Sequence, residues 1–305
     1  MKRITMLSTS VALAAVLALN GCGGGSSSDL AFADAGVSDA TVAKSTVSGQ
    51  AIDPELVGAT VCLDFNRDGI CNEDEPSATT NEDGTYRLDL SDEHLNGEYP
   101  LIAINGTDKE SKEAFKGKFF ADVDSTHQHI TPLTTLTYEN MQQYRNKTTT
   151  EMQSSMEKLA NALGLTHEEM QSNMITSANE GKTTALQVAL TLQKSAEAVA
   201  PKDTIQFYKD LAQQIDRSDE RDNLRTSILE VTPENLKDEV SSLTETILES
   251  RLTNAYALAE EARMKAIELG IDHITMLEML PETPEVPELP ETTDENPTPI
   301  NIPSL

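Results

Sequence analysis

The residues best suited to chemistry lie between Asp64 and Glu75, where oxygen-bearing side chains occur at alternate positions. Calcium is held by six to eight oxygen atoms at about 2.3–2.6 Å, which carboxylates, amides and main-chain carbonyls supply. Gly69 allows the sharp turn that brings such oxygens together. The residues expected to surround the ion, with Ile70 acting through its carbonyl, are Asp64, Asn66, Asp68, Ile70, Asn72 and Glu75. This spacing predicts a Ca²⁺ site.

The alternative interpretation of this loop is an exposed turn, rich in Asp, Asn and Gly, that binds no ion. A match at every diagnostic position favours calcium, and Mg²⁺ fits less well because it requires stricter octahedral geometry. The strand-like run 57–63 precedes the loop and Pro76 follows it. The paired helices of a calcium sensor are therefore not expected, and the ion is predicted to stabilise the fold.

The first residues of the chain combine a positive start, an apolar run and a cysteine. Lys2 and Arg3 precede the uncharged run 11–19, which is too short for a membrane span of about 20 residues but fits a secretory signal. Leu19-Asn20-Gly21-Cys22 then resembles the bacterial lipobox. The resemblance implies that residues 1–21 are a lipoprotein signal peptide and that Cys22 carries the lipid, with acyl chains such as palmitate.

This anchor predicts a location in the cell envelope, on its periplasmic or surface face. Gly23 follows Cys22 where the inner-membrane retention signal of bacterial lipoproteins has Asp, which favours the outer membrane. The alternative is an ordinary secretory signal followed by a chance cysteine. In an exported chain Cys62 and Cys71 are predicted to form a disulfide, because that compartment is oxidising; two free, buried thiols are the alternative.

The composition limits the classes of partner. The formal net charge is −28, and removal of residues 1–21, which contain two basic and no acidic residues, makes it −30. Such a charge repels nucleic acid and anionic lipid but attracts divalent cations and basic surfaces. Aromatic residues make up 4% of the chain and Trp is absent, so an aliphatic core is expected.

Changes in composition divide the chain into segments. Residues 22–45 are rich in Gly and Ser and predict a flexible tether. Short apolar runs at 57–63, 85–90, 101–104 and 115–120, separated by turn residues, predict a β-sandwich over 46–131. In Thr85–Leu90 apolar and polar residues alternate, as expected of a strand with one buried face.

The apolar period changes after Pro132. Spacings of three and four predict five or six helices within 132–280, enough for a bundle. Pro201 is expected in the first turn of one helix, and the last long helix is expected to begin at Thr232-Pro233 and end at Gly270. Residues 281–305 repeat Pro and Glu and predict a disordered tail.

A family resemblance covers the β part. The strand-like 57–64, the EF-hand-type loop and residues 75–86 look like calcium-bearing sandwich repeats of bacterial surface proteins and like carboxypeptidase-regulatory-like domains. The resemblance implies an Ig/transthyretin-like sandwich with spacer or adhesion roles, towards carbohydrate or protein, and no catalysis in the domain itself. Segment 131–136 looks like one that joins such domains to helical regions in exported bacterial proteins.

Weaker signals have less specific interpretations. His127 and His129 lie two residues apart and are either half a zinc site or, as we expect, exposed strand histidines. Methionines at helical spacing either handle copper or, as we expect, fill the core: Met141, Met152, Met156, Met170 and Met174. No sequence motif of a known catalytic site is present.

Together these features predict an α+β protein with separate domains. We expect a lipid-anchored binding or structural protein, with a structural Ca²⁺ ion, that presents its helical module to a protein or carbohydrate of the envelope. It is not expected to be an enzyme or to bind nucleic acid. Two alternatives remain: an envelope hydrolase with its site between the β and helical parts, and a passive surface spacer.

Overall fold

The computed structural model describes residues 44–53, 55–91, 99–109, 111–123, 128–218 and 222–271. The predicted signal peptide, Cys22, nearly all of the tether and the tail 281–305 lie outside these residues. Strands occupy the first part of the described chain and helices the second, so the α+β class is confirmed. No helix in the described residues has the length and apolar character needed to cross a membrane.

The β part contains three small sheets. Strands β1 and β5 form an antiparallel pair, β2 and β7 form a second, and the third sheet has the order β4-β3-β6-β8. The strand bounds are β1 Lys44–Gln50, β2 Leu56–Val57, β3 Thr60–Leu63, β4 Ser77–Thr79, β5 Thr85–Ser91, β6 Pro100–Ile104, β7 Thr107–Asp108 and β8 Lys118–Asp122. Strand β5 buries Tyr86, Leu88 and Leu90 and exposes Arg87 and Asp89, which confirms the predicted alternation.

The four-stranded sheet is buried on both faces. Val61, Leu101 and Phe119 pack with the β1–β5 pair in one apolar cluster. Their neighbours Cys62 and Ile102 belong to a second cluster, whose other members are mostly helical residues. Strands covered on both sides form continuous apolar runs, which explains the unbroken Val61-Cys62-Leu63 and Leu101-Ile102-Ala103.

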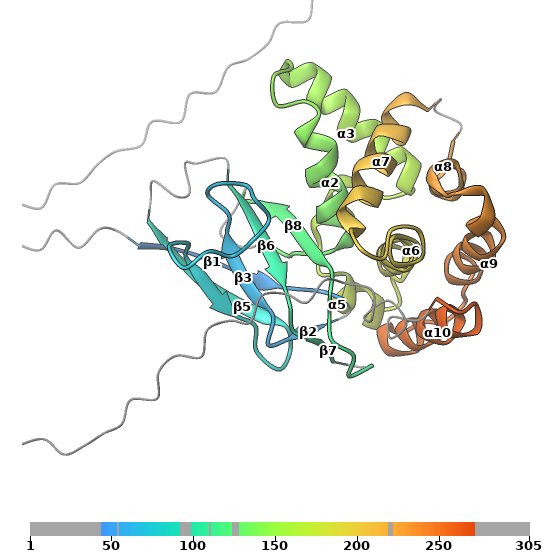
Figure 1. Cartoon of the computed structure of the whole chain (residues 1–305), viewed down its shortest axis with the longest axis horizontal. Coiled ribbons are helices and arrows are strands. Elements are labelled where there is room, and N and C mark those ends of the chain that lie inside the picture. Colours follow the sequence, from blue (N-terminus) through green and yellow to red (C-terminus); the bar gives the residue numbers. More distant parts are fainter. Residues whose placement is uncertain are drawn as a thin grey trace, which may run out of the picture. The chain divides into compact units, whose positions relative to one another are not determined.

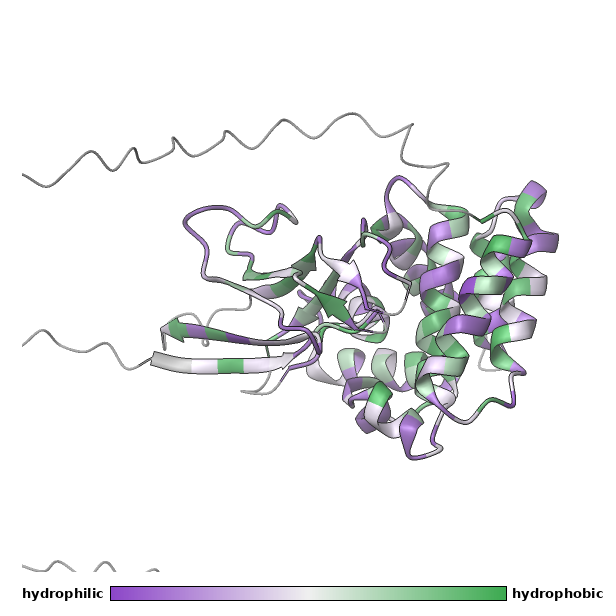
Figure 2. Cartoon of the chain, turned by 90° about the horizontal axis from the view of Figure 1, so that it is seen from below, coloured by the Kyte–Doolittle hydropathy of each residue, from purple (hydrophilic) through white to green (hydrophobic). Residues whose placement is uncertain are grey.

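The helices cover the other face of this sheet, as Figure 1 shows. Their bounds are α2 Pro132–Gln142, α3 Thr149–Leu163, α4 His167–Gln171, α5 Met174–Asn179, α6 Thr184–Val199, α7 Thr204–Arg217, α8 Leu224–Val231, α9 Lys237–Leu248 and α10 Ala255–Glu268, with a 3-10 turn over Glu234–Leu236. Apolar and polar residues mix along each helix in Figure 2, as expected of helices with one buried face.

The helix expectations need three corrections. The described residues contain nine α-helices, because α4 and α5 are too short to give a periodic signal. Pro201 precedes α7 and does not lie in its first turn. The expected last long helix is interrupted: Gln187 donates to the carbonyls of Leu248 and Ser250 at the end of α9, and a new helix begins at the N-cap Asn254.

The β and helical parts share an apolar core. Helix α2 follows directly on the β part, and Phe120 of β8 stacks on Tyr138 of α2 with ring centroids 5.0 Å apart. The described residues, all of which lie between 44 and 271, form one compact unit by their contacts. The change from strands to helices at Thr131-Pro132 therefore lies within a continuously packed region.

Candidate metal centre

The loop from Asp64 to Glu75 begins where β3 ends, so its first residue is fixed by the sheet. Asp64 is fully buried, and its N–H donates to the carbonyl of Pro100 over 2.9 Å. Its Oδ1 accepts from the N–H of Asp68 over 3.2 Å, and its Oδ2 accepts from the N–H of Gly69 over 3.0 Å. Gly69 has a φ of +74°, a left-handed conformation that favours glycine. The sharp turn expected of a calcium loop is present.

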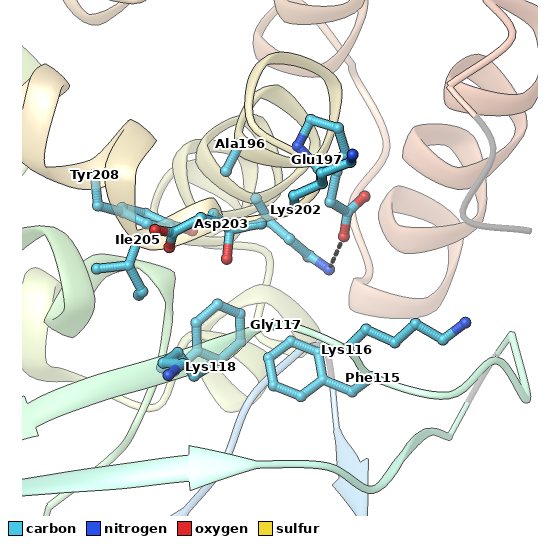
Figure 3. A pocket seen from close by; sticks show the side chains of 14 residues that line it. Phe115, Lys116, Gly117, Lys118, Ala196, Glu197, Lys202, Asp203, Ile205 and Tyr208 are labelled. Atoms are coloured by element: carbon cyan, nitrogen blue, oxygen red, sulfur yellow. Dashed lines mark hydrogen bonds between the residues drawn. The ribbon is translucent and has the colours of Figure 1, made fainter. Parts of the chain in front are cut away.

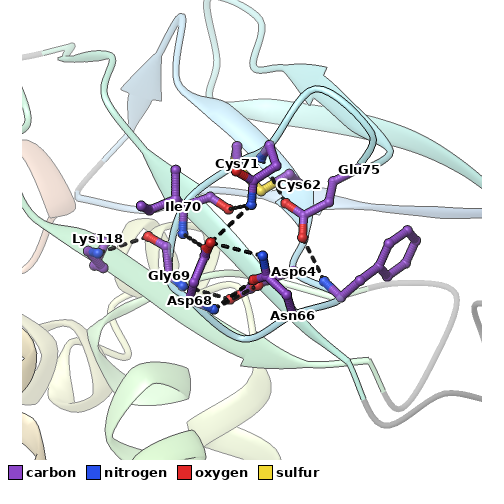
Figure 4. Close-up of a disulfide and its surroundings, with 11 residues drawn as sticks. Cys62, Asp64, Asn66, Asp68, Gly69, Ile70, Cys71, Glu75 and Lys118 are labelled. Atoms are coloured by element: carbon purple, nitrogen blue, oxygen red, sulfur yellow. Dashed lines mark hydrogen bonds between the residues drawn. A yellow bond between two sulfur atoms is a disulfide. The ribbon is translucent and has the colours of Figure 1, made fainter. Parts of the chain in front are cut away.

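Asp68 lies at the centre of the loop's polar contacts (Figure 4). Its Oδ1 accepts from the N–H of Ile70 over 2.8 Å. Its Oδ2 accepts from Nδ2 of Asn66 over 2.9 Å and from Nδ2 of Asn72 over 3.1 Å. The hydrogen bond from Asn72 is the main reason why the pKa of Asp68 lies below its usual value.

The Asn72 amide also points at a second predicted ligand. Its Nδ2 lies 3.4 Å from the carbonyl oxygen of Ile70 as well as 3.1 Å from Asp68 Oδ2. Two predicted calcium ligands, Asp68 and Ile70, thus direct oxygens at the same positively polarised NH₂ group. The position of that group is therefore one where positive charge is favourable. Turning the Asn72 amide by half a turn would present its own oxygen there instead.

Glu75 closes the loop from its other end. Its side chain is buried, with Oε1 accepting from the N–H of Phe65 over 2.8 Å and Oε2 from the N–H of Asn72 over 2.9 Å. Each carboxylate oxygen has a second lone pair, so these contacts leave acceptor capacity. Glu73 and Asp74, by contrast, are exposed.

The six predicted ligands lie within one loop, but the three carboxylates among them, those of Asp64, Asp68 and Glu75, are not grouped together. Among the described residues, no three His, Cys, Asp or Glu side chains are grouped closely enough to hold a metal ion. A calcium shell here would depend on amide and main-chain oxygens and on closer approach of the carboxylates. In the described part of the chain neither Asp64 nor Glu75 forms an ion pair. The donor types fit calcium, whereas the three carboxylates are not grouped as closely as a calcium shell requires.

A disulfide joins Cys62 and Cys71, as predicted, with 5.7 Å between their Cα atoms. Cys62 lies in the buried strand β3 and Cys71 lies in the middle of the loop. The bridge therefore fastens the loop to the sheet (Figure 4). Lys118 at the start of β8 adds a second attachment, because its Nζ donates to the carbonyl of Gly69 over 2.8 Å. The sequence did not predict the role of Lys118, because no local pattern indicates a contact between residues that are 49 positions apart.

The weaker histidine and methionine signals have separate outcomes. His129 is buried and not exposed as expected, whereas His127 lies outside the described residues. Met170 and Met174 are buried in the apolar core, as expected. Met141 and Met152 are only half-buried.

A second polar cluster, which the sequence did not indicate, lies away from the loop. In α6, Lys194 Nζ pairs with Glu197 Oε2 at 3.0 Å, and both side chains are largely buried. Asp53 lies near this pair: burial lowers the pKa of Lys194, but the charges of Glu197 and Asp53 outweigh burial and raise it. Burial raises the pKa of Tyr208, and the charges of Asp53 and Glu197 add to that rise. The sequence signal for this cluster is the polar pair Gln193-Lys194, followed by Glu197, in a helix made mostly of apolar and small residues.

Comparisons of the chain with protein-family models, with curated proteins and with solved structures found no match. The loop and the second polar cluster are therefore the observations that bear on function.

Proposed function

We propose that this chain is a lipid-anchored protein of the bacterial cell envelope whose loop binds Ca²⁺ as a structural ion. The observation that carries the calcium assignment is the convergence of Asp68 Oδ2 and the Ile70 carbonyl on the Asn72 amide. Asp64 and Glu75 support it, because two buried carboxylates with backbone donors alone are costly until a cation compensates them. The ion would contribute electrostatic neutralisation and hold the loop's oxygens together.

The remaining parts of the proposal follow from the sequence. Cys22 carries the lipid after cleavage of residues 1–21, the outer membrane is the favoured location, and residues 22–45 are the tether. The packing of the β1–β5 pair on the four-stranded sheet supports the Ig/transthyretin-like sandwich. The helices present a surface to a protein or carbohydrate partner, and the net charge of −28 makes nucleic acid an unfavourable one.

A hydrolase remains the second candidate, because cavities lie between the β part and the helices, where such a site was expected. The residues that line the two cavities in this region include no His or Cys. These linings thus offer neither a Cys nucleophile nor a His base, and we favour binding over hydrolysis.

Calorimetric titration of the full chain without residues 1–22, first freed of metal, tests the calcium assignment. We expect one site with a Kd of about 10⁻⁴–10⁻³ M, the range of extracellular calcium modules, and weaker binding of Mg²⁺. Calcium should also raise the melting temperature, because a ligand that binds only the folded state stabilises it. If millimolar calcium gave neither a heat of binding nor a rise in melting temperature, the loop would be an exposed turn that binds no calcium.

A further inference from the structure

Two adjoining cavities lie between the β part and helices α6, α7 and α10. They have volumes of about 90 Å³ and about 40 Å³ and share Phe115 and Gln193 in their walls. Figure 3 shows Phe115 and Lys118 on the strand side of the larger cavity and Glu197 and Tyr208 on its helix side. The smaller cavity reaches Asp53, Asp108 and Lys194.

Asp53 is the decisive residue of the smaller cavity. Its side chain is buried, with 6% of the residue exposed, and its Oδ1 has no hydrogen-bond partner among the described residues. An unpartnered buried acceptor destabilises the fold, and does so more strongly when it is charged. A group in the cavity that donates to this oxygen would remove that cost.

The lining of the smaller cavity contains more acidic than basic side chains. Glu197 is engaged by Lys194 and by Gln193, and Glu260 is engaged by Arg263 over 2.7 Å. Burial raises the pKa of Asp53 well above its usual value, Lys194 opposes this rise, and the Glu197 and Asp108 charges add to it. The carboxyl therefore tends to keep its proton when the cavity holds no cation, and a bound cation would take the place of that proton. The acidic residues in the lining are Asp53, Asp108, Glu113 and Glu260, against the bases Lys194 and Arg263.

The rest of the lining suits the apolar part of a small ligand. Leu190 and Ala259 provide aliphatic surface, and Phe115 provides an aromatic ring. A cation near an aromatic face is attracted by the ring's electron density. Metal ions are a poorer match, because Leu190, Ala259 and Phe115 offer no oxygen ligand.

We propose that the smaller cavity binds a compact organic cation, a primary ammonium or a guanidinium group, with Asp53 as its counter-ion. The N–H donors of such a group supply the hydrogen bond that Asp53 Oδ1 lacks, and its positive charge balances the excess of carboxylates. The site is separate from the calcium loop, so this inference does not depend on the proposed function.

The test is a titration of the full chain without residues 1–22 with methylammonium and with methylguanidinium chloride, at constant ionic strength and constant calcium. Saturable binding is expected for at least one of the two, with tetramethylammonium binding more weakly because it has no N–H to donate. Asp53→Asn is expected to lower the affinity at least about tenfold, as loss of a charge-assisted hydrogen bond implies. Asp203→Asn is the matched control, since Asp203 lines only the larger cavity, and it should bind as the parent does.

A second variant keeps the test decisive if Asp53→Asn does not fold. Phe115→Leu keeps an apolar side chain but removes the aromatic face, and it is expected to weaken binding about two- to fivefold. Absence of saturable binding of either probe to the parent would overturn the proposal. Parent-like affinity in folded Asp53→Asn, or in Phe115→Leu should Asp53→Asn not fold, would also overturn it.

Discussion

The hydroxyl oxygen of Thr135 accepts a hydrogen bond from the backbone N–H of Phe120 over 3.0 Å. Phe120 belongs to β8, the edge strand of the four-stranded sheet, and its carbonyl accepts from Thr134 Oγ1 over 2.8 Å. Both threonines lie in the first turn of α2. Side chains of a helix thus bond to backbone groups that a further strand would otherwise pair, which closes this edge and joins the β and helical parts.

Loss of the Thr135 hydroxyl should destabilise the whole protein. In Thr135→Val the N–H of Phe120 stays buried without a partner, so the free energy of unfolding should fall by about 1–3 kcal/mol in urea. Thr137→Val is the control, because its hydroxyl bonds to Leu133 O within the same helix and is only half-buried. Equal losses of unfolding free energy in the two variants would mean that the hydrogen bond from Phe120 to Thr135 adds no stability beyond that of a threonine hydroxyl within the helix.

Features encoded by neighbouring residues were predictable from the sequence, and features set by distant ones were not. The alternation in Thr85–Leu90 and the Cys62–Cys71 pair depend on local spacing, and both predictions are confirmed. The break between α9 and α10 involves Gln187, about sixty residues earlier, whose amide bonds to the end of α9. An apolar run such as 61–63 indicates burial but does not tell which layer covers each face.

The disulfide should stabilise the protein through its effect on the unfolded chain. For a ring this short the chain-entropy model gives roughly 2.5–3 kcal/mol, less any native strain. Reduction with dithiothreitol should therefore lower the melting temperature of the parent. Cys71→Ser is the control, since it already lacks the bridge and should melt at the same temperature with and without reductant. The prediction would be contradicted if the reduced parent, with both thiols shown by alkylation to be free, melted at the same temperature as the oxidised parent.

Calcium stabilisation should depend on Glu75 and hardly on its exposed neighbour Glu73. Glu75→Gln removes the carboxylate expected to bind through both oxygens, so most of the calcium-dependent rise in melting temperature should disappear. Glu73→Gln changes the charge equally but affects a side chain that is not a predicted ligand. Both variants are compared with the parent in calcium and in chelator. A similar response in both would show that calcium acts through general charge screening.

The lipid anchor should depend on the Cys22 thiol. Cys22→Ala removes the atom that would carry the diacylglycerol, so the protein should remain uncleaved or be released in soluble form. Metabolic labelling with a palmitate analogue, followed by membrane fractionation, measures the outcome. Acylation that persists in Cys22→Ala would place the lipid, if any, on another residue.

The pH dependence of stability should carry a contribution from Glu139 in α2. This side chain is 5% exposed, and burial raises its pKa to about 7, with Asp203 adding to the rise and Lys209 opposing it. The carboxyl group is therefore protonated in the folded protein at pH values where the unfolded chain, with a usual pKa near 4.5, has lost the proton. Its contribution to stability is fully present below about pH 4.5 and is lost as the pH rises through about 7.

The size of this loss follows from the shift. Each pKa unit corresponds to about 1.4 kcal/mol, so the folded state should lose about 3 kcal/mol from this group between the two pKa values. Glu139→Gln keeps the shape without the charge, and its stability advantage over the parent should grow from near zero at pH 4.5 to that amount at pH 8. Taking the difference between the two proteins cancels the other titrating groups. The measurement is urea unfolding of both across this range, with Glu157→Gln, an exposed glutamate of α3, as the control. A difference that stays constant with pH, or that grows as the pH falls, would contradict a buried, protonated Glu139.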